Sequence, residues 1–539
     1  MKQVKYVFGL MAIIGSLSSY NLVHAGGSDD HDPAQVAIGE RLFLETRFAQ
    51  ANAAHPGQAD PVMAYTLTLK QTLRGPFAGK TMNCRACHLV DEHKSNPAAG
   101  MRSYADFARL SPIPGRGDGQ HFTSRNAMSM VNITPVDRRD AVFHYDGQFN
   151  SMEDLVRGTL VGRNYGWLPN ETAQAGRHIA QVIRHDDGSD ELAREYGGSY
   201  RKVLTGTAKD TPAEFRLPPA YRVNVATASD AQIVAAVAKL IAAYVDDLHY
   251  AQDSQGNYIG SPYDQFLKLN HLPRQARKNE SASAYAQRLL QAVNGLKSPK
   301  FIRGEDQHFK YHQQAFAFTK QELAGMKLFF TRGSAKQRGG NCVSCHAAPD
   351  FSDFGFHNTG VTQANYDEQH GSGAFGRLLI PDLNMRNRHY DQFLPATPAH
   401  PAASGHFRMH VNADKPGETD LGLWNVFANP DLPAPQAKLL RIMCRQHADV
   451  PCNAEALLPY TIAAFKTPVL RDLGHSNPYM HTGEFDTLAD AVRFYITTSA
   501  LVKSHQLRNV DKELYSVNLR QQDIAPLVAF LKALNEDYE

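Results

Sequence analysis

The pattern Cys-x-x-Cys-His occurs twice in the chain, as Cys84-Arg85-Ala86-Cys87-His88 and as Cys342-Val343-Ser344-Cys345-His346. Two thiols one helical turn apart can add to the two vinyl groups of a haem, and the histidine that follows is then placed to bind the iron. A redox-active cysteine pair or a zinc site would not require a histidine directly after each pair. The sequence therefore predicts two covalently attached haems c, held by Cys84, Cys87, His88, Cys342, Cys345 and His346, with the two histidines as iron ligands.

Each motif follows a segment with the pattern of a helix, at Gly39–Phe43 before the first and at Gly325–Phe330 before the second. A further amphipathic helix is predicted between them, because Ser229 and Asp230 are typical capping residues and apolar side chains then recur at helical spacing up to Leu248. Strand patterns are sparse. We expect a mainly α protein of two cytochrome-c-like haem domains packed together, with long loop-rich insertions at 49–80, 268–318 and 358–440. The expected division is a signal peptide at 1–25, an N-terminal haem domain at 26–248, a helical insertion or linker at 249–318 and a C-terminal haem domain at 319–539.

The first residues have the pattern of an export signal. Lys2 and Lys5 precede an apolar run at 6–17, and 23–25 offers the small residues that signal peptidase reads. The run is shorter than the roughly 20 residues of a membrane-spanning helix, so we expect cleavage after Ala25, a periplasmic location and no membrane insertion. The 56 Lys and Arg residues nearly balance the 54 Asp and Glu residues, which disfavours nucleic acid as a partner.

Two cysteines remain outside the motifs, at Cys444 and Cys452. In an oxidising compartment such a pair most simply forms a local disulfide that closes a loop. A redox-active role is the alternative, and nothing else in the sequence favours it.

Further segments resemble the bacterial di-haem cytochrome c peroxidase and MauG superfamily. Together with the two motifs they occur in the order found in that family, and they are Ser124–Asn126, Phe143–Gln148, Ser151–Leu155, Ser261–Leu267, Phe465–Asp472, Pro478–Gly483, Thr487–Leu488 and Val492–Tyr495. The resemblance implies that the first haem reacts with peroxide and that the second transfers electrons. The inserted segments are not covered by it.

The resemblance also implies a role for two tyrosines. Tyr495 occupies the position where the peroxidases carry an axial methionine and MauG an axial tyrosine, so it is a candidate second ligand of the second iron. A buried helix aromatic is the alternative for Tyr495, and Met480 is the rival ligand. Tyr145 takes the place of the family's tryptophan between the haems, and we expect it to carry electrons or holes between the two irons.

Two positions before the bridging segment match less specific features of the family. Asn126 matches a residue that contributes to an interdomain calcium in the peroxidases, whereas an asparagine bonding the backbone at a turn is the alternative. His121 lies in the glycine-rich region where the peroxidases hold a removable distal histidine, although at a different offset. A solvated loop histidine is the alternative there.

The chain departs from the family where the distal acid–base group is expected. Cleavage of peroxide needs a group that takes a proton from one oxygen and returns it to the other. The family uses a glutamate about 20 residues past the bridging aromatic, but here that stretch is Gly162–Trp167, and Leu155 replaces a nearby glutamine. Asn164 and Tyr165 are the candidates for positioning peroxide instead.

The leading hypothesis is a peroxidase that reduces hydrogen peroxide to water with electrons from a small mono-haem cytochrome c or a cupredoxin. Tyr495 and the missing glutamate favour a second hypothesis, a MauG-like oxidase that modifies a partner protein through a high-valent state of the two irons. A third is a non-catalytic di-haem electron-transfer or sensor protein. The sequence leaves the oligomeric state open, with a homodimer among the options.

Overall fold

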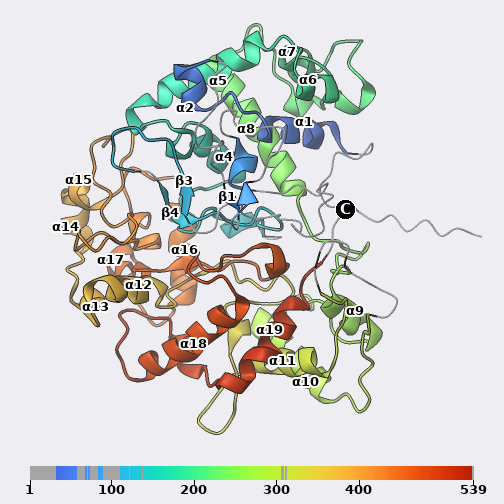
Figure 1. Ribbon diagram of the computed structural model, residues 1–539, viewed down its shortest axis with the longest axis vertical. Helices are drawn as coiled ribbons and strands as arrows, with labels where there is room; N and C mark the ends of the chain where they lie inside the picture. Colours follow the sequence, from blue (N-terminus) through green and yellow to red (C-terminus); the bar gives the residue numbers. More distant parts are fainter. Residues whose placement is uncertain are drawn as a thin grey trace, which may run out of the picture.

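The computed structural model describes residues 32–56, 67–68, 71–72, 83–88, 110–120, 122–135, 138–304, 309, 312 and 314–536 (Figure 1). The predicted signal peptide at 1–25 lies outside the described residues, as do His121 and most of the predicted insertion at 49–80.

Helices form most of the regular structure in the described residues. The α-helices are α1 (Ala34–Phe43), α2 (Gln50–Ala54), α4 (Met152–Leu160), α5 (Thr172–His185), α6 (Glu191–Glu195), α7 (Tyr200–Thr205), α8 (Asp230–Asp247), α9 (Pro262–Leu269), α10 (Ala282–Asn294), α11 (Lys320–Phe330), α12 (Val361–His370), α13 (Ala374–Arg377), α14 (Leu383–Arg388), α15 (Tyr390–Phe393), α16 (Gln436–Gln446), α17 (Ala454–Leu457), α18 (Leu488–Lys503) and α19 (Ile524–Lys532). Short antiparallel strand pairs join β1 (Leu67–Thr68) to β2 (Gln71–Thr72), β3 (Leu110–Pro112) to β4 (Phe122–Asn126) and β5 (Phe356–His357) to β6 (Phe465–Lys466). The predicted mainly α composition is confirmed.

The first core is built around α8, in the upper part of Figure 1. Helix α8 begins after Ser229, as predicted: Ser229 Oγ accepts from the Gln232 N–H, and the Gln232 side chain accepts from the Ser229 N–H. This capping box satisfies donors that a helix start leaves unpaired. Helix α1 crosses α8 at Gly39, where an added Cβ would overlap the Leu240 carbonyl oxygen. The crossing therefore requires glycine.

The second core repeats this arrangement in the lower part of Figure 1. Helix α11 crosses α19 at Gly325, where an added Cβ would overlap the Pro526 carbonyl oxygen. In each core, then, the helix that precedes a C-x-x-C-H motif crosses a second helix at a glycine. Helices α9 and α10 of the predicted linker contribute Phe266 and Leu289 to this second core.

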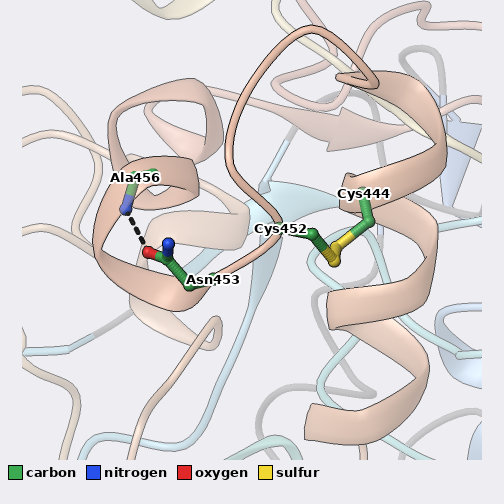
Figure 2. Close-up of a disulfide and its surroundings, with 4 residues drawn as sticks. All are labelled: Cys444, Cys452, Asn453 and Ala456. Carbon is green, nitrogen blue, oxygen red and sulfur yellow. Dashed lines mark hydrogen bonds between the residues drawn. A yellow bond between two sulfur atoms is a disulfide. The ribbon is translucent and has the colours of Figure 1, made fainter.

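A third core lies between 356 and 464, where the sequence suggested mostly loops. Helices α12 to α16 occupy this region (left side of Figure 1), and Trp424 is fully buried at its centre. Val142, from the first half of the chain, also belongs to it. The predicted disulfide is confirmed: Cys444, at the end of α16, bonds Cys452 with a Cα–Cα distance of 5.1 Å (Figure 2). No helix in the described part of the chain has the length and apolar content needed to cross a bilayer.

Candidate haem-binding sites

The first C-x-x-C-H motif forms a tight turn that starts as a 3-10 helix at Cys84–Ala86. The backbone N–H of His88 donates to the Cys84 carbonyl oxygen over 2.9 Å, which closes the turn. The His88 Nδ1–H donates to the Met128 carbonyl oxygen over 2.8 Å, so the Nε2 lone pair is available for a metal. Burial lowers the pKa of His88 to about 4, and the ring is therefore neutral near pH 7.

The second motif repeats this geometry. The His346 N–H donates to the Cys342 carbonyl oxygen over 2.8 Å, and His346 Nδ1–H donates to the Phe351 carbonyl oxygen over 3.1 Å. Burial again lowers the pKa of the histidine to about 4. None of the four motif cysteines is in a disulfide. Free thiol pairs, each with a neutral histidine anchored through Nδ1, are the donor set that covalent attachment of haem c needs, so the residues present fit the predicted groups.

Tyr165 lies against the first motif. Its hydroxyl is 3.2 Å from Cys84 Sγ, and the residue is 2% exposed. Burial raises the pKa of this phenol well above its ordinary value, so it stays protonated and able to donate. Asn164, one residue earlier in the same 3-10 turn, is exposed. Of the two candidates for positioning peroxide, Tyr165 is therefore the one beside an attachment cysteine.

The carboxylates near this turn are bound to arginines. Asp118 pairs with Arg163 over 2.6 Å, and Glu171 pairs with Arg116 over 2.6 Å. Hydrogen bonds from these arginines lower the pKa of both carboxyl groups. Both remain ionised at neutral pH, and both are held in ion pairs by their arginines.

Tyr145 is held between the first half of the chain and strand β6. It is 8% exposed, and its carbonyl oxygen accepts from the Lys466 N–H over 2.8 Å. Lys466 Nζ donates in turn to the Val142 carbonyl oxygen over 2.7 Å. Burial raises the pKa of the Tyr145 phenol. The predicted bridging residue thus lies where the 143–148 segment meets the segment that leads into the second half of the chain.

A buried ion network surrounds the residue after Tyr145, and sequence reasoning missed it. Asp146 Oδ2 lies 2.9 Å from Arg125 and 2.8 Å from Arg408, while Arg125 also pairs with Asp420 over 2.6 Å. His144 Nδ1 lies 3.2 Å from Asp146 Oδ1. The arginines hold the pKa of Asp146 well below its ordinary value although burial opposes this. Only the resemblance of 124–126 and 143–148 to known segments pointed to this region.

The chain is 29% identical to the cytochrome-c peroxidase IdrP2 of Denitromonas iodatirespirans over 219 residues, 41% of this chain and 41% of that protein. The predicted resemblance to the di-haem peroxidase and MauG superfamily is confirmed. A second relative from the same organism, the cytochrome-c peroxidase IdrP1, is 36% identical over 77 residues, 14% of this chain and 19% of that protein. The chain thus spans less than half the length of the curated relatives that it matches, and no family model matches it.

Two solved structures align with the chain over most of its length. The diheme peroxidase BthA of Burkholderia thailandensis is 18% identical, with 94% of this chain and 86% of that one covered and a TM-score of 0.40. A MauG-like protein associated with microbial copper homeostasis is 15% identical, with 97% and 96% covered and a TM-score of 0.44.

Tyr495, which the resemblance makes a candidate axial ligand, lies on α18 near the second motif. It is half-buried and packs against the second core. Burial raises the pKa of its phenol. Met480, the rival ligand, lies in a turn in which its carbonyl oxygen accepts from Gly483.

Asn126 connects β4 to the 478–481 segment. Its Nδ2 donates to the Pro478 carbonyl oxygen over 2.7 Å, and its N–H donates to the His481 carbonyl oxygen over 2.7 Å. Its Oδ1 is buried without a hydrogen-bond partner among the described residues. The side chain therefore bonds backbone and also presents one unsatisfied oxygen.

Proposed function

We propose that the chain is a periplasmic di-haem c-type peroxidase that reduces hydrogen peroxide to water with electrons from a small redox protein, a mono-haem cytochrome c or a cupredoxin. The observation that carries the proposal is the repeated motif geometry, in which His88 and His346 are each neutral, anchored through Nδ1 and adjacent to two free thiols. The likeness to the cytochrome-c peroxidases supports it.

The residues of the chain have distinct roles in this proposal. Bound haem would supply one iron that reacts with peroxide and a second that passes electrons. His88 and His346 would hold the two irons. Tyr165, protonated and beside Cys84, orients peroxide as a hydrogen-bond donor, with Asn164 at the solvent side of the same turn. Tyr145 lies on the route between the two haem domains, 26–248 and 319–539.

In this proposal proton transfer differs from that of the family, because the family's distal glutamate is missing from this chain. Asp118 and Glu171 are each held in an ion pair with an arginine, so neither is a free base. In this proposal the Tyr165 hydroxyl or water carries the proton from one peroxide oxygen to the other, and we expect a lower rate of peroxide cleavage than a free, positioned carboxylate would give.

Calcium at Asn126 belongs to the same proposal. The buried, unsatisfied Oδ1 supports it, because a carbonyl-type oxygen without a hydrogen bond is a suitable ligand for a hard cation. Calcium titration of the haem-loaded protein, compared with that of Asn126→Ala, tests this point.

Tyr495 favours a second candidate, a MauG-like oxidase that modifies a partner protein. A phenolate ligand favours the oxidised states of iron, so the second haem would hold an oxidising equivalent well and accept an electron poorly. The position of Tyr495 beside Cys342 and Cys345 supports this reading.

Stopped-flow absorption of the haem-loaded protein with one equivalent of hydrogen peroxide separates these functions. Repeated turnover with a reduced mono-haem cytochrome c supports the peroxidase, and Tyr165→Phe should then slow the peroxide step. A long-lived oxidised state that the donor barely reduces supports the MauG-like oxidase. The absence of any reaction, also after reduction by one electron, leaves an electron-transfer protein.

A further inference from the structure

The hydroxyl of Tyr258 joins two segments that are far apart in the sequence. It donates to Asp350 Oδ1 and accepts from Asn132 Nδ2 over 2.9 Å. Asn132 Nδ2 also lies 3.4 Å from Asp350 Oδ1. Tyr258 is 5% exposed, whereas Asn132 and Asp350 are half-buried, so the three side chains form a small, partly buried polar cluster.

On one side this cluster leads to the first haem motif. Asn132 lies four residues after Met128, whose carbonyl oxygen accepts the Nδ1–H of His88. The Asn132 N–H donates to the Leu248 carbonyl oxygen over 2.8 Å, which fixes this loop against the end of α8. A short stretch of ordered backbone therefore separates Tyr258 from the segment that anchors His88.

On the other side the cluster leads to the second haem motif. Asp350 directly precedes Phe351, whose carbonyl oxygen accepts the Nδ1–H of His346. The phenol of Tyr258 thus bonds both loops that hold the candidate iron ligands. Among the described residues, the hydroxyl of Tyr145, the bridging residue expected from the resemblance, makes no such pair of contacts.

The neighbours of the Tyr258 ring determine whether its oxidation must be accompanied by loss of a proton. The Arg471 guanidinium lies 3.8 Å over the Tyr258 ring and is paired with Asp264 over 2.9 Å. A cation at this distance stabilises the electron-rich ring and opposes positive charge on it. Loss of an electron must therefore be accompanied by loss of the phenolic proton, and Asp350 already accepts the hydrogen bond along which that proton would move. Burial raises the pKa of Tyr258, so the phenol does not ionise beforehand.

We propose that Tyr258 is a redox-active tyrosine that relays oxidising equivalents between the two haem-binding segments, with Asp350 as its proton acceptor. The inference rests on the proposed function, because hydrogen peroxide, which takes up two electrons and two protons to give two molecules of water, is the oxidant. Tyr258 supplies one of these electrons, and the small redox donor supplies the other directly. The Tyr258 O–H bond breaks, the proton passes to the Asp350 carboxylate, and a neutral tyrosyl radical remains. An electron from the small redox donor and the proton held by Asp350 then restore the phenol.

Freeze-quench electron paramagnetic resonance tests this relay. The haem-loaded protein, produced with ring-deuterated tyrosine, is mixed with one equivalent of hydrogen peroxide and frozen within milliseconds. We expect an organic radical signal that deuteration narrows, its loss in Tyr258→Phe, and its retention in Tyr250→Phe. Tyr250 is the matched control, because its ring centre lies 6.5 Å away and it is as buried, but its hydroxyl donates to the Arg471 carbonyl oxygen rather than to a carboxylate. Asp350→Asn, which keeps the shape but not the proton acceptor, should slow radical formation at least tenfold.

The same radical in Tyr258→Phe, or no tyrosyl radical in a protein that consumes peroxide, would overturn the proposal. A protein that consumes no peroxide would instead refute the proposed function. Flash photo-oxidation by ruthenium(III) tris-bipyridine then replaces peroxide as the oxidant. Loss of the deuterium-sensitive signal in Tyr258→Phe but not in Tyr250→Phe supports the assignment to Tyr258, and its retention in Tyr258→Phe overturns the assignment. Circular dichroism and haem absorption of each variant show that it is folded and loaded.

Discussion

Replacement of Arg408 by methionine should destabilise the protein by about 3 kcal/mol. Arg408 comes from the 358–440 insertion and lies 2.8 Å from Asp146 Oδ2, and the side chain of Asp146 is 0% exposed. In the wild type, Arg125 and Arg408 balance Asp146 and Asp420. Without Arg408, the Asp146 carboxylate keeps only Arg125, which it shares with Asp420. Breaking a buried pair costs roughly 3–5 kcal/mol. The lower end applies because the side chain of Arg408 is 18% exposed.

Urea unfolding of the haem-loaded protein at pH 7 measures this cost. The control is Arg157→Met, because Arg157 pairs with Asp154 at the surface, where the side chains are 57% and 32% exposed and such a pair contributes about 0.5 kcal/mol at most. The double variant with Asp146→Asn removes the uncompensated charge, so its loss should be smaller than the sum of the two single losses. A loss in Arg408→Met no larger than that of the control would refute the reasoning.

Three further stability predictions follow from single features. Burial raises the pKa of Glu536 from 4.5 to about 8. The stability linked to its neutral form is therefore complete below pH 4.5 and is lost as the pH rises through 8. Glu536→Gln should flatten the fall in melting temperature between pH 5 and pH 8, and an unchanged slope would contradict this. Cys444→Ser opens a loop with a sequence separation of 8 and should cost about 2.5 kcal/mol, which reductant should reproduce in the wild type but not in the variant. Gly325→Ala should cost about 1–3 kcal/mol, as measured by urea unfolding, whereas Gly376→Ala, where an added Cβ meets no atom within 4 Å, should cost nothing.

Local patterns predicted much of the fold. The helix after Ser229, the helices before each motif and the disulfide all depend on residues within a few turns of one another, and the structure contains each of them. Turn geometry within Cys84–His88 is likewise local, which is why the candidate haem-attachment residues could be chosen from the sequence.

Features that depend on distant partners could not be predicted in the same way. Arg125 and Asp420 are 295 positions apart, and nothing in either segment identifies the other as its partner. The core around Trp424 is assembled from short helices separated by Gly- and Pro-rich turns, so its apolar residues show no extended period. The contact of Tyr258 with Asn132 and Asp350 likewise arises only when the two halves come together.

The motif thiols have a consequence for the order of biosynthesis. In the folded chain burial raises the pKa of Cys84 to about 11 and that of Cys342 to about 12, so few thiolates exist there to react. If these thiols hold haem as proposed, we therefore expect attachment before the cores close. The Cys444–Cys452 bond forms by oxidation, whereas the motif cysteines must stay reduced until they are used. If the motif cysteines hold haem as proposed, maturation has to direct six cysteines to two opposite fates. The sequence separation of the paired cysteines, three in each motif and eight in the disulfide, is the information in the chain that distinguishes them.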